Sequence, residues 1–158
     1  MAAYTVKHRD EFEAMEGSGE ATWHLARKAL GTSCFGFNLV EIGPGVALQL
    51  LQVDFDHNIR VTRARLAPGV RLRTHIHTGH VFAWTVAGTW HYLEYPESSR
   101  ANAYLYEPAG SQHTLHVPDD STEPADVIFI VHGSNLELGA TGEFEGATSA
   151  ADIAPSAA

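Results

Sequence analysis

Residues 69–88 read GVRLRTHIHTGHVFAWTVAG, and this stretch carries the pattern on which the fold prediction rests. A glycine stands at each end of this stretch, and a single residue separates His75 from His77. The second half of the stretch is rich in valine, threonine and aromatic residues. Such residues favour strands, and successive side chains along a strand point to opposite faces. We therefore expect His75 and His77 to project from one face of an extended segment.

The same strand-like composition recurs along the rest of the chain. Segments of this kind end at Gly, Pro, Asn or Asp, and they span residues 34–42, 46–53, 59–66, 81–86, 90–95, 103–106 and 125–131. Short segments at this spacing are typical of an all-β sandwich or barrel. No convincing amphipathic helix of more than three turns is present, so the predicted fold class is all-β in a single domain.

Composition divides the chain into three parts. Residues 1–30 are polar and are expected to be a partly flexible lead-in, in which residues 9–15 could form one short helix. Residues 31–138 hold the strand-like segments and are the predicted barrel. Residues 139–158 are rich in Ala, Gly, Thr and Ser, and we expect this tail to be disordered.

Charge and cysteine content exclude several classes of protein. The 158 residues include 19 acidic and 10 basic side chains, for a formal net charge of −9, and a single cysteine, Cys34. The acidic balance argues against nucleic acid as a partner, and one cysteine excludes a disulfide framework and a cysteine-based zinc site. The sequence has neither a membrane-spanning run nor a leader pattern, so no membrane partner and a cytoplasmic location are expected.

Histidines are concentrated in the second half of the chain. Seven of the ten lie between positions 75 and 132. Two imidazoles on one strand face can bind one metal ion, and the turn Pro-Ala-Gly-Ser-Gln that precedes His113 can deliver a third. A lone histidine is more often a surface or core residue, but the combination predicts a metal site of His75, His77 and His113. Three protein ligands leave open positions, as catalytic metal sites do.

These residues also carry a family resemblance. Gly69-(five residues)-His75-x-His77-(ten residues)-Gly88 resembles the first motif of the cupin superfamily, and Pro108-x-Gly110-x-x-His113 resembles the second. The resemblance implies a small β-barrel, a jelly-roll-like double-stranded β-helix, with a metal ion inside it. The glutamate of the first motif is replaced by Val81. The resemblance therefore implies three neutral nitrogens and no anionic ligand.

Residues 80–96, HVFAWTVAGTWHYLEYP, are similar to the cupin group of 2,4'-dihydroxyacetophenone dioxygenase and, more distantly, of acetylacetone dioxygenase. This similarity implies a mononuclear non-haem Fe(II) enzyme. Such an enzyme would use O2 to cleave a C–C bond of a small α-hydroxy ketone or β-diketone and give carboxylic acids. Imidazole ligands also accept Zn, Ni and Mn, so the metal's identity stays open.

The strand pattern suggests which residues surround the substrate. Val81, Ala83 and Thr85 share one face of a predicted strand, and their small size would leave room for a substrate. Tyr92 and Tyr104 are predicted at the mouth of this pocket.

Three residues are predicted to contact the substrate or to act behind the metal ligands: His91, Arg63 and Arg65. An inward arginine could neutralise a substrate oxyanion, whereas a solvated surface stripe is the alternative for Arg63 and Arg65. Whether His91 or Glu94 is a fourth metal ligand stays open.

Other functions remain possible at this point. The first alternative is a non-enzymatic metal-binding cupin, such as the zinc-binding half of certain anti-sigma factors. The second is a cupin isomerase or a small-metabolite binder. The resemblance also favours a homodimer, and Trp84 and Trp90 are expected to be core or interface packing residues on the face opposite the predicted pocket.

Overall fold

The computed structural model describes residues 11, 13–16, 21–25, 38–42, 44–95 and 97–153. The strands in this part of the chain are β1 (Glu13–Glu16), β2 (Ala21–Leu25), β3 (Asn38–Ile42), β4 (Val46–Asp54), β5 (Ile59–Leu66), β6 (His75–His77), β7 (Val81–Ala87), β8 (Thr89–Tyr92), β9 (Ser98–Arg100), β10 (Tyr104–Glu107), β11 (Gln112–His113), β12 (Leu115–His116), β13 (Ala125–His132), β14 (Asn135–Leu138) and β15 (Phe144–Thr148). These described ranges contain no α-helix, and thus none that could cross a bilayer. The all-β prediction is confirmed.

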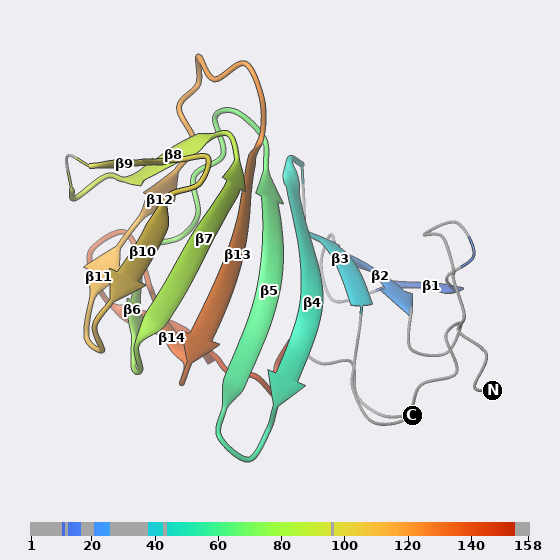
Figure 1. The fold of residues 1–158 in the computed structure, drawn as a ribbon. Coiled ribbons are helices and arrows are strands. Elements are labelled where there is room, and N and C mark those ends of the chain that lie inside the picture. The colour runs from blue at the N-terminus through green and yellow to red at the C-terminus, as the bar shows by residue number, and fades with distance from the viewer. Residues whose placement is uncertain are drawn as a thin grey trace.

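The strands form three antiparallel sheets. The largest has eight strands in the order β1-β2-β3-β4-β5-β13-β7-β10. A four-stranded sheet has the order β11-β6-β14-β15, and a three-stranded sheet has the order β12-β8-β9. In Figure 1, β1–β3 lie at one end of the large sheet and β10 lies at the other, on the side where the smaller sheets gather.

The hydrophobic core lies between the large sheet and the smaller ones. Leu66, Ala83 and Val127 contribute from the large sheet, and Trp90 and Leu115 contribute from the three-stranded sheet. All five are nearly or fully buried. Burying a large apolar side chain stabilises the fold by roughly 1.5–3 kcal/mol, so this core holds the sheets in a fixed relation around the histidines.

Gly88 marks the point where the chain passes from the large sheet to the three-stranded sheet. Its φ is +72°, which disfavours any side chain, and a Cβ there would lie 2.4 Å from the carbonyl oxygen of Pro124. Glycine at the end of the first motif is therefore a packing requirement.

Most of the predicted strands are present. Those at 46–53, 59–66, 81–86, 103–106 and 125–131 match β4, β5, β7, β10 and β13 to within one residue at each end. The segment predicted at 90–95 ends earlier, because residues 93–94 form a turn after β8. Of the segment 34–42, residues 38–42 form β3, and the rest lies outside the described residues.

At both ends of the chain the structure describes strands where the sequence suggested flexible or helical segments. Residues 139–153 include β15, which a turn in which Gly139 N–H donates to Glu143 O brings back to pair with β14. Residues 139–158 contain few large apolar side chains, but hydrogen bonding between the backbones of two strands does not require them. Residues 13–16, expected to be flexible or helical, form β1 and pair with β2. The remainder of the predicted helix and residues 154–158 lie outside the described residues.

Candidate metal centre

Two histidines of the centre come from β6, the second strand of the four-stranded sheet. Because side chains alternate along a strand, His75 and His77 share its inner face, where they are 9% and 4% exposed. The Nδ1–H of His75 donates to the carbonyl oxygen of Arg73 over 2.8 Å. This bond leaves Nε2 of His75 as the ring nitrogen with a free lone pair.

The third histidine arrives through the turn of the second motif. Gly110 has a φ of +85°, and its N–H donates to the carbonyl oxygen of His77 over 2.7 Å, so the turn is anchored to β6. The chain then enters β11, where His113 pairs with His75 and is 1% exposed. One ring nitrogen from each of the three histidines lies within 4.8 Å of the others. The structure thus brings the three predicted ligands together.

A buried carboxylate that the sequence analysis did not find completes the cluster. Glu107 lies on β10 directly opposite Val81 on β7, so a carboxylate is present one strand away from the position where the first motif lacks its own. Its Oε2 lies 3.2 Å from Nε2 of His77 and 3.4 Å from Nε2 of His113. The Tyr92 hydroxyl donates to its Oε1, and the Tyr92 ring stacks on His113 with centroids 3.8 Å apart.

The charge states of these groups follow from their burial. Burial, and to a lesser extent the neighbouring His75, lowers the pKa of both His77 and His113 to about 3. Burial raises the pKa of Glu107 to about 7, against the opposing effect of the Tyr92 hydroxyl. Both imidazoles are therefore neutral at neutral pH, and their contacts with Glu107 are not ion pairs.

The donor set fits a divalent metal ion. Three imidazoles converge, and the buried Oε2 of Glu107 has no hydrogen-bond partner. Buried polar atoms are normally paired, and a cation between the three imidazoles would satisfy their lone pairs together. His75, His77 and His113 would hold the ion, and Glu107 stands beside it.

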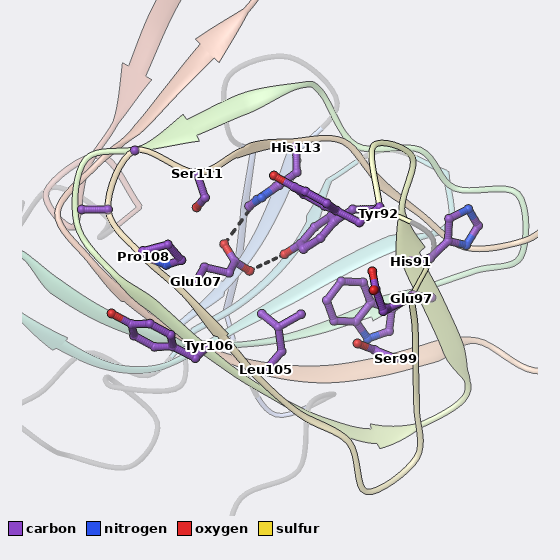
Figure 2. A pocket seen from close by; sticks show the side chains of 14 residues that line it. His91, Tyr92, Glu97, Ser99, Leu105, Tyr106, Glu107, Pro108, Ser111 and His113 are labelled. Atoms are coloured by element: carbon purple, nitrogen blue, oxygen red, sulfur yellow. Dashed lines mark hydrogen bonds and ion pairs between the residues drawn. The ribbon is translucent and has the colours of Figure 1, made fainter.

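A cavity of about 560 Å³ opens beside this cluster. Its walls include Trp90, Tyr92, Leu105, Tyr106 and Pro108, and none of the residues that line it is lysine or arginine. In Figure 2 the carboxyl group of Glu107 lies between Tyr92 and His113, at the inner side of the cavity. The cavity therefore has largely apolar walls, with the polar cluster on one side.

Hydrogen bonds between threonines tie the two ligand-bearing strands together. The hydroxyl of Thr114, next to His113, donates to Glu94 over 2.7 Å, and its N–H donates to the other Glu94 oxygen over 2.8 Å. The hydroxyl of Thr74, next to His75, lies 2.6 Å from that of Thr114 and donates to it. Because both oxygens of Glu94 are engaged, this residue positions the strands and is outside the metal cluster.

Of the two alternatives for Arg63 and Arg65, the structure follows the solvated surface one. Arg63 and Arg65 are exposed on the outer face, and Arg63 makes a bidentate pair with Asp126 at 2.8 and 2.6 Å. Even-numbered residues of β5 face inward, so the buried cation is Arg60, which donates to Asn135 over 2.6 Å. Burial lowers the pKa of Arg60 to about 10, and the side chain stays charged at neutral pH.

The predicted pocket residues divide into three groups. Val81, Ala83 and Thr85 face inward as expected, but they are packed in the interior and do not line the cavity. Tyr92 lines the cavity. Tyr104 is 61% exposed on the outer face of β10, because alternation places Leu105 and Glu107 inward.

His91 also lies at the cavity wall but outside the histidine cluster. Its ring packs edge-on against His116, with centroids 5.2 Å apart, and Figure 2 shows it turned away from Glu107. It therefore stays a predicted substrate contact. Trp90 is a fully buried core residue, as expected, but it lines the cavity and does not lie on the face opposite the pocket. A bend at Gly88 resets the alternation between β7 and β8.

Comparison with known proteins now identifies the family. The sequence profile of the ChrR cupin-like domain matches residues 36–135. The chain belongs to this cupin family. A cupin-fold protein of unknown function from Ralstonia eutropha is 38% identical, with a TM-score of 0.67, over 69% of this cupin and 68% of that chain. No curated protein matches the present chain.

Two more distant structures share the fold. An RmlC-like cupin from Ralstonia eutropha is 22% identical, with a TM-score of 0.70, over 81% of this cupin and 85% of that chain. Acetylacetone dioxygenase from Acinetobacter johnsonii is 13% identical, with a TM-score of 0.62, over 96% of this cupin and 88% of that chain. At these identities the likeness shows the fold alone.

Proposed function

We propose that this cupin is a mononuclear Fe(II) dioxygenase that cleaves a C–C bond of a small α-hydroxy ketone or β-diketone. The observation that carries the proposal is the carboxyl group of Glu107. It is buried beside two of the three clustered histidines, has one oxygen without a hydrogen-bond partner, and lies at a cavity large enough for a small ketone. Acetylacetone dioxygenase shares the fold, so the fold is compatible with this reaction class.

Glu107 would act as the base in this reaction. Its raised pKa of about 7 matches the range in which a carboxylate both accepts and releases a proton near neutral pH. The Tyr92 hydroxyl holds Oε1, so Oε2 is the atom that receives the proton from the carbon or hydroxyl group of the substrate. Burial raises the pKa of Tyr92 well above its ordinary value, so Tyr92 remains a donor throughout.

The cavity selects the substrate by charge and by shape. Trp90 and Leu105 give it apolar walls that exclude water from the reacting end. Because no lysine or arginine lines it and two glutamates, Glu97 and Glu107, do, a free carboxylate or phosphate on the substrate would be disfavoured. We therefore expect a neutral ketone.

The proposed reaction balances without a further reductant. For a terminal α-hydroxy ketone and one O2, the bond between the carbonyl and hydroxyl carbons breaks and each carbon gains one oxygen atom. The products are one carboxylic acid and formic acid, and the substrate provides all four electrons that reduce O2. The bound Fe(II) would supply the Lewis acidity and the O2 activation.

Oxygen uptake by reconstituted protein tests this proposal. The protein is stripped of metal, loaded anaerobically with Fe(II), and assayed with 2-hydroxyacetophenone and acetylacetone in an oxygen electrode. We expect iron-dependent O2 consumption with at least one of the two substrates. Stoichiometric iron binding without uptake of O2 from hydroxyketones and diketones would refute the proposal.

The family match favours one second candidate, a metal-binding sensor domain of the ChrR cupin-like type. Zinc would then be the resident metal, and the cavity beside Glu107 would serve no chemistry. Tight zinc binding to His75, His77 and His113, together with an iron form that consumes no O2, would favour this candidate.

A further inference from the structure

The position of the proton on His77 decides whether this residue can bind a metal ion. A neutral imidazole carries its proton on one ring nitrogen and a free lone pair on the other, and only the nitrogen with the lone pair can be a ligand. Nε2 of His77 faces the cluster, 3.1 Å from Nε2 of His113 and 3.2 Å from Oε2 of Glu107. Metal binding through Nε2 therefore requires the proton to be on Nδ1.

The neighbours on the cluster side favour the opposite arrangement. Oε2 of Glu107 and Nε2 of His113 can each accept a hydrogen bond from an Nε2–H of His77, and that proton would occupy the lone pair that the metal needs. On the other side of the ring, Nδ1 of His77 is buried and makes no hydrogen bond. Because an unpaired buried donor is costly, a proton on Nδ1 needs an acceptor there.

Asn135 is placed to supply that acceptor. It lies on β14 directly opposite His77 on β6, so the two side chains share the inner face of the four-stranded sheet. The Cβ atoms of such a pair are about 4.5–5.5 Å apart. The pKa of His77 is lowered mainly by burial, and the Asn135 side chain opposes this lowering, as an acceptor for a ring N–H does.

Arg60 determines which atom of the Asn135 amide is available. A guanidinium has only donors, so the atom of Asn135 that Arg60 contacts over 2.6 Å is the carbonyl oxygen Oδ1. Arg60 is itself held in place, because it is 4% exposed and also donates to the carbonyl oxygen of Gly133 over 2.8 Å. An amide oxygen has two lone pairs, so Oδ1 can accept from Arg60 and from His77 together.

We propose that Asn135 is a positioning residue of the metal centre: Arg60 orients its Oδ1 toward Nδ1–H of His77, and this tautomer presents the Nε2 lone pair to the metal ion. His75 meets the same requirement within its own strand, because its Nδ1–H donates to the carbonyl oxygen of Arg73. Partners of this kind fix the tautomer and the ring orientation of metal-binding histidines, and their loss typically weakens metal binding roughly 10–100-fold.

This inference rests on the metal centre of the proposed function but not on the reaction. The tautomer of His77 and the affinity for zinc are both measured without substrate and without O2. A chain that binds zinc through this network but consumes no O2 when loaded with iron would refute the proposed function and support the inference.

NMR of metal-free protein with ¹⁵N-labelled histidine measures the tautomer directly, with the His77 signals assigned from the spectrum of His77→Gln. In the wild type near neutral pH we expect the proton of His77 on Nδ1. In Asn135→Leu, which keeps the size of the side chain but removes the acceptor, we expect the proton on Nε2. A wild type with the proton on Nε2, or an unchanged tautomer in Asn135→Leu, would overturn the proposal.

Zinc affinity, measured by titration calorimetry, gives the second readout. Asn135→Leu should weaken Zn(II) binding roughly 10–100-fold, whereas Asn135→Asp, which keeps an acceptor for Arg60 and His77, should stay within about threefold of the wild type. The matched control is Thr78→Val, which removes the 2.8 Å bond from Ser134 N–H to the exposed Thr78 hydroxyl next to His77 and should not change the affinity.

The two variants of Asn135 separate positioning from packing. If Asn135→Leu and Asn135→Asp lost zinc affinity equally, the acceptor would have no role and the proposal would fail. If Asn135→Leu does not fold, the wild-type tautomer and the affinity of Asn135→Asp decide by the same criteria.

Discussion

Two histidine clusters lie close together in the sequence but differ in the arrangement of their rings and in their burial. In the inner cluster, His75, His77 and His113 point one nitrogen each at a common region beside a buried carboxylate. In the outer pair, the rings of His80 and His132 lie tilted against each other, with centroids 3.9 Å apart and an interplanar angle of 31°. Among the described residues, no third histidine, cysteine or carboxylate joins this pair in a group that could hold a metal ion. Convergence of lone pairs therefore distinguishes the metal centre, and the density of histidines does not.

Burial separates the two clusters further. Desolvation lowers the pKa of His132, with a smaller effect of His80, whereas it lowers the pKa of His77 and His113 as far as about 3. His77 and His113 therefore stay neutral over a wide pH range and remain available to a metal ion. The outer pair lies next to Phe82 and Tyr106 and belongs with the apolar outer face of the sheet.

The largest difference between the clusters should appear in metal binding. Replacement His113→Ala removes one of three ligands and should weaken Fe(II) or Zn(II) binding at least 100-fold, and with it abolish O2 uptake. Replacement His132→Ala should leave both unchanged. Metal content after dialysis, measured by mass spectrometry, checks this. Equal loss of metal from the two variants would show that the clusters are not distinct.

The next largest effect should come from the carboxylate that only the inner cluster has. Replacement Glu107→Gln keeps the shape and the Tyr92 contact but removes the base, so kcat should fall roughly 100–1000-fold while bound iron is retained. The control is Glu97→Gln at the cavity wall, with a change in kcat of less than about threefold expected. Loss of iron in parallel with activity would instead make Glu107 a metal ligand.

Acid should destabilise the metal-free protein through the inner cluster. The folded-state pKa of His77 and of His113, about 3, lies below the ordinary 6.5, so below pH 6.5 the unfolded chain binds more protons than the folded one. Stability present above pH 6.5 is lost as pH falls toward 3, by up to about 2 kcal/mol per histidine at pH 5.

Glu107 acts in the opposite direction. Its folded-state pKa of about 7 is above the ordinary 4.5, so its contribution is complete below pH 4.5 and is lost as pH rises through 7. Between pH 7 and 5 the wild type should therefore lose only about half as much stability as Glu107→Gln, because protonation of Glu107 offsets the effect of roughly one of the two histidines; below pH 5 both proteins should lose more. Urea unfolding of metal-free protein measures this. If the unfolding free energies of the wild type and of Glu107→Gln had the same dependence on pH, the raised pKa of Glu107 would be contradicted.

A smaller effect should follow from loosening the strands that carry the ligands. Replacement Thr114→Val keeps the shape but removes the hydroxyl bonds to Thr74 and Glu94, at a cost of about 1 kcal/mol in unfolding free energy. Metal affinity should weaken about threefold to tenfold. The control Thr141→Val removes a similar bond to Glu143 in the exposed β14–β15 connection and should not change metal affinity. If Thr114→Val and Thr141→Val changed metal affinity equally, Thr114 would have no role in positioning the metal ligands.

The inner histidines could be predicted from the sequence because their geometry is mostly local. Alternation alone places His75 and His77 on one face, and a short turn delivers His113. The strand pattern was equally local, and β5, β7 and β13 follow it closely.

What could not be predicted depends on pairing between distant segments. Glu107 belongs to the site because β10 pairs with β7 in the register that sets it opposite Val81, and no local pattern encodes that register. The inward position of Arg60 could have been predicted. Side chains alternate along β5, so Arg60 lies on the same face as the apolar Ala64 and Leu66, which mark the inner side of the strand. The strand β15 forms because its backbone pairs with that of β14. Its small and polar side chains give no strand pattern from which this pairing could be predicted.

We propose that the inner cluster and Glu107 together form a centre for oxidative C–C cleavage. The most direct test is product analysis after turnover of 2-hydroxyacetophenone by the iron-loaded protein under ¹⁸O2. We expect benzoic acid and formic acid in equal amounts, one O2 consumed per substrate molecule, and one ¹⁸O atom in each acid. Unchanged hydroxyketones and diketones after prolonged incubation with fully iron-loaded protein would contradict it.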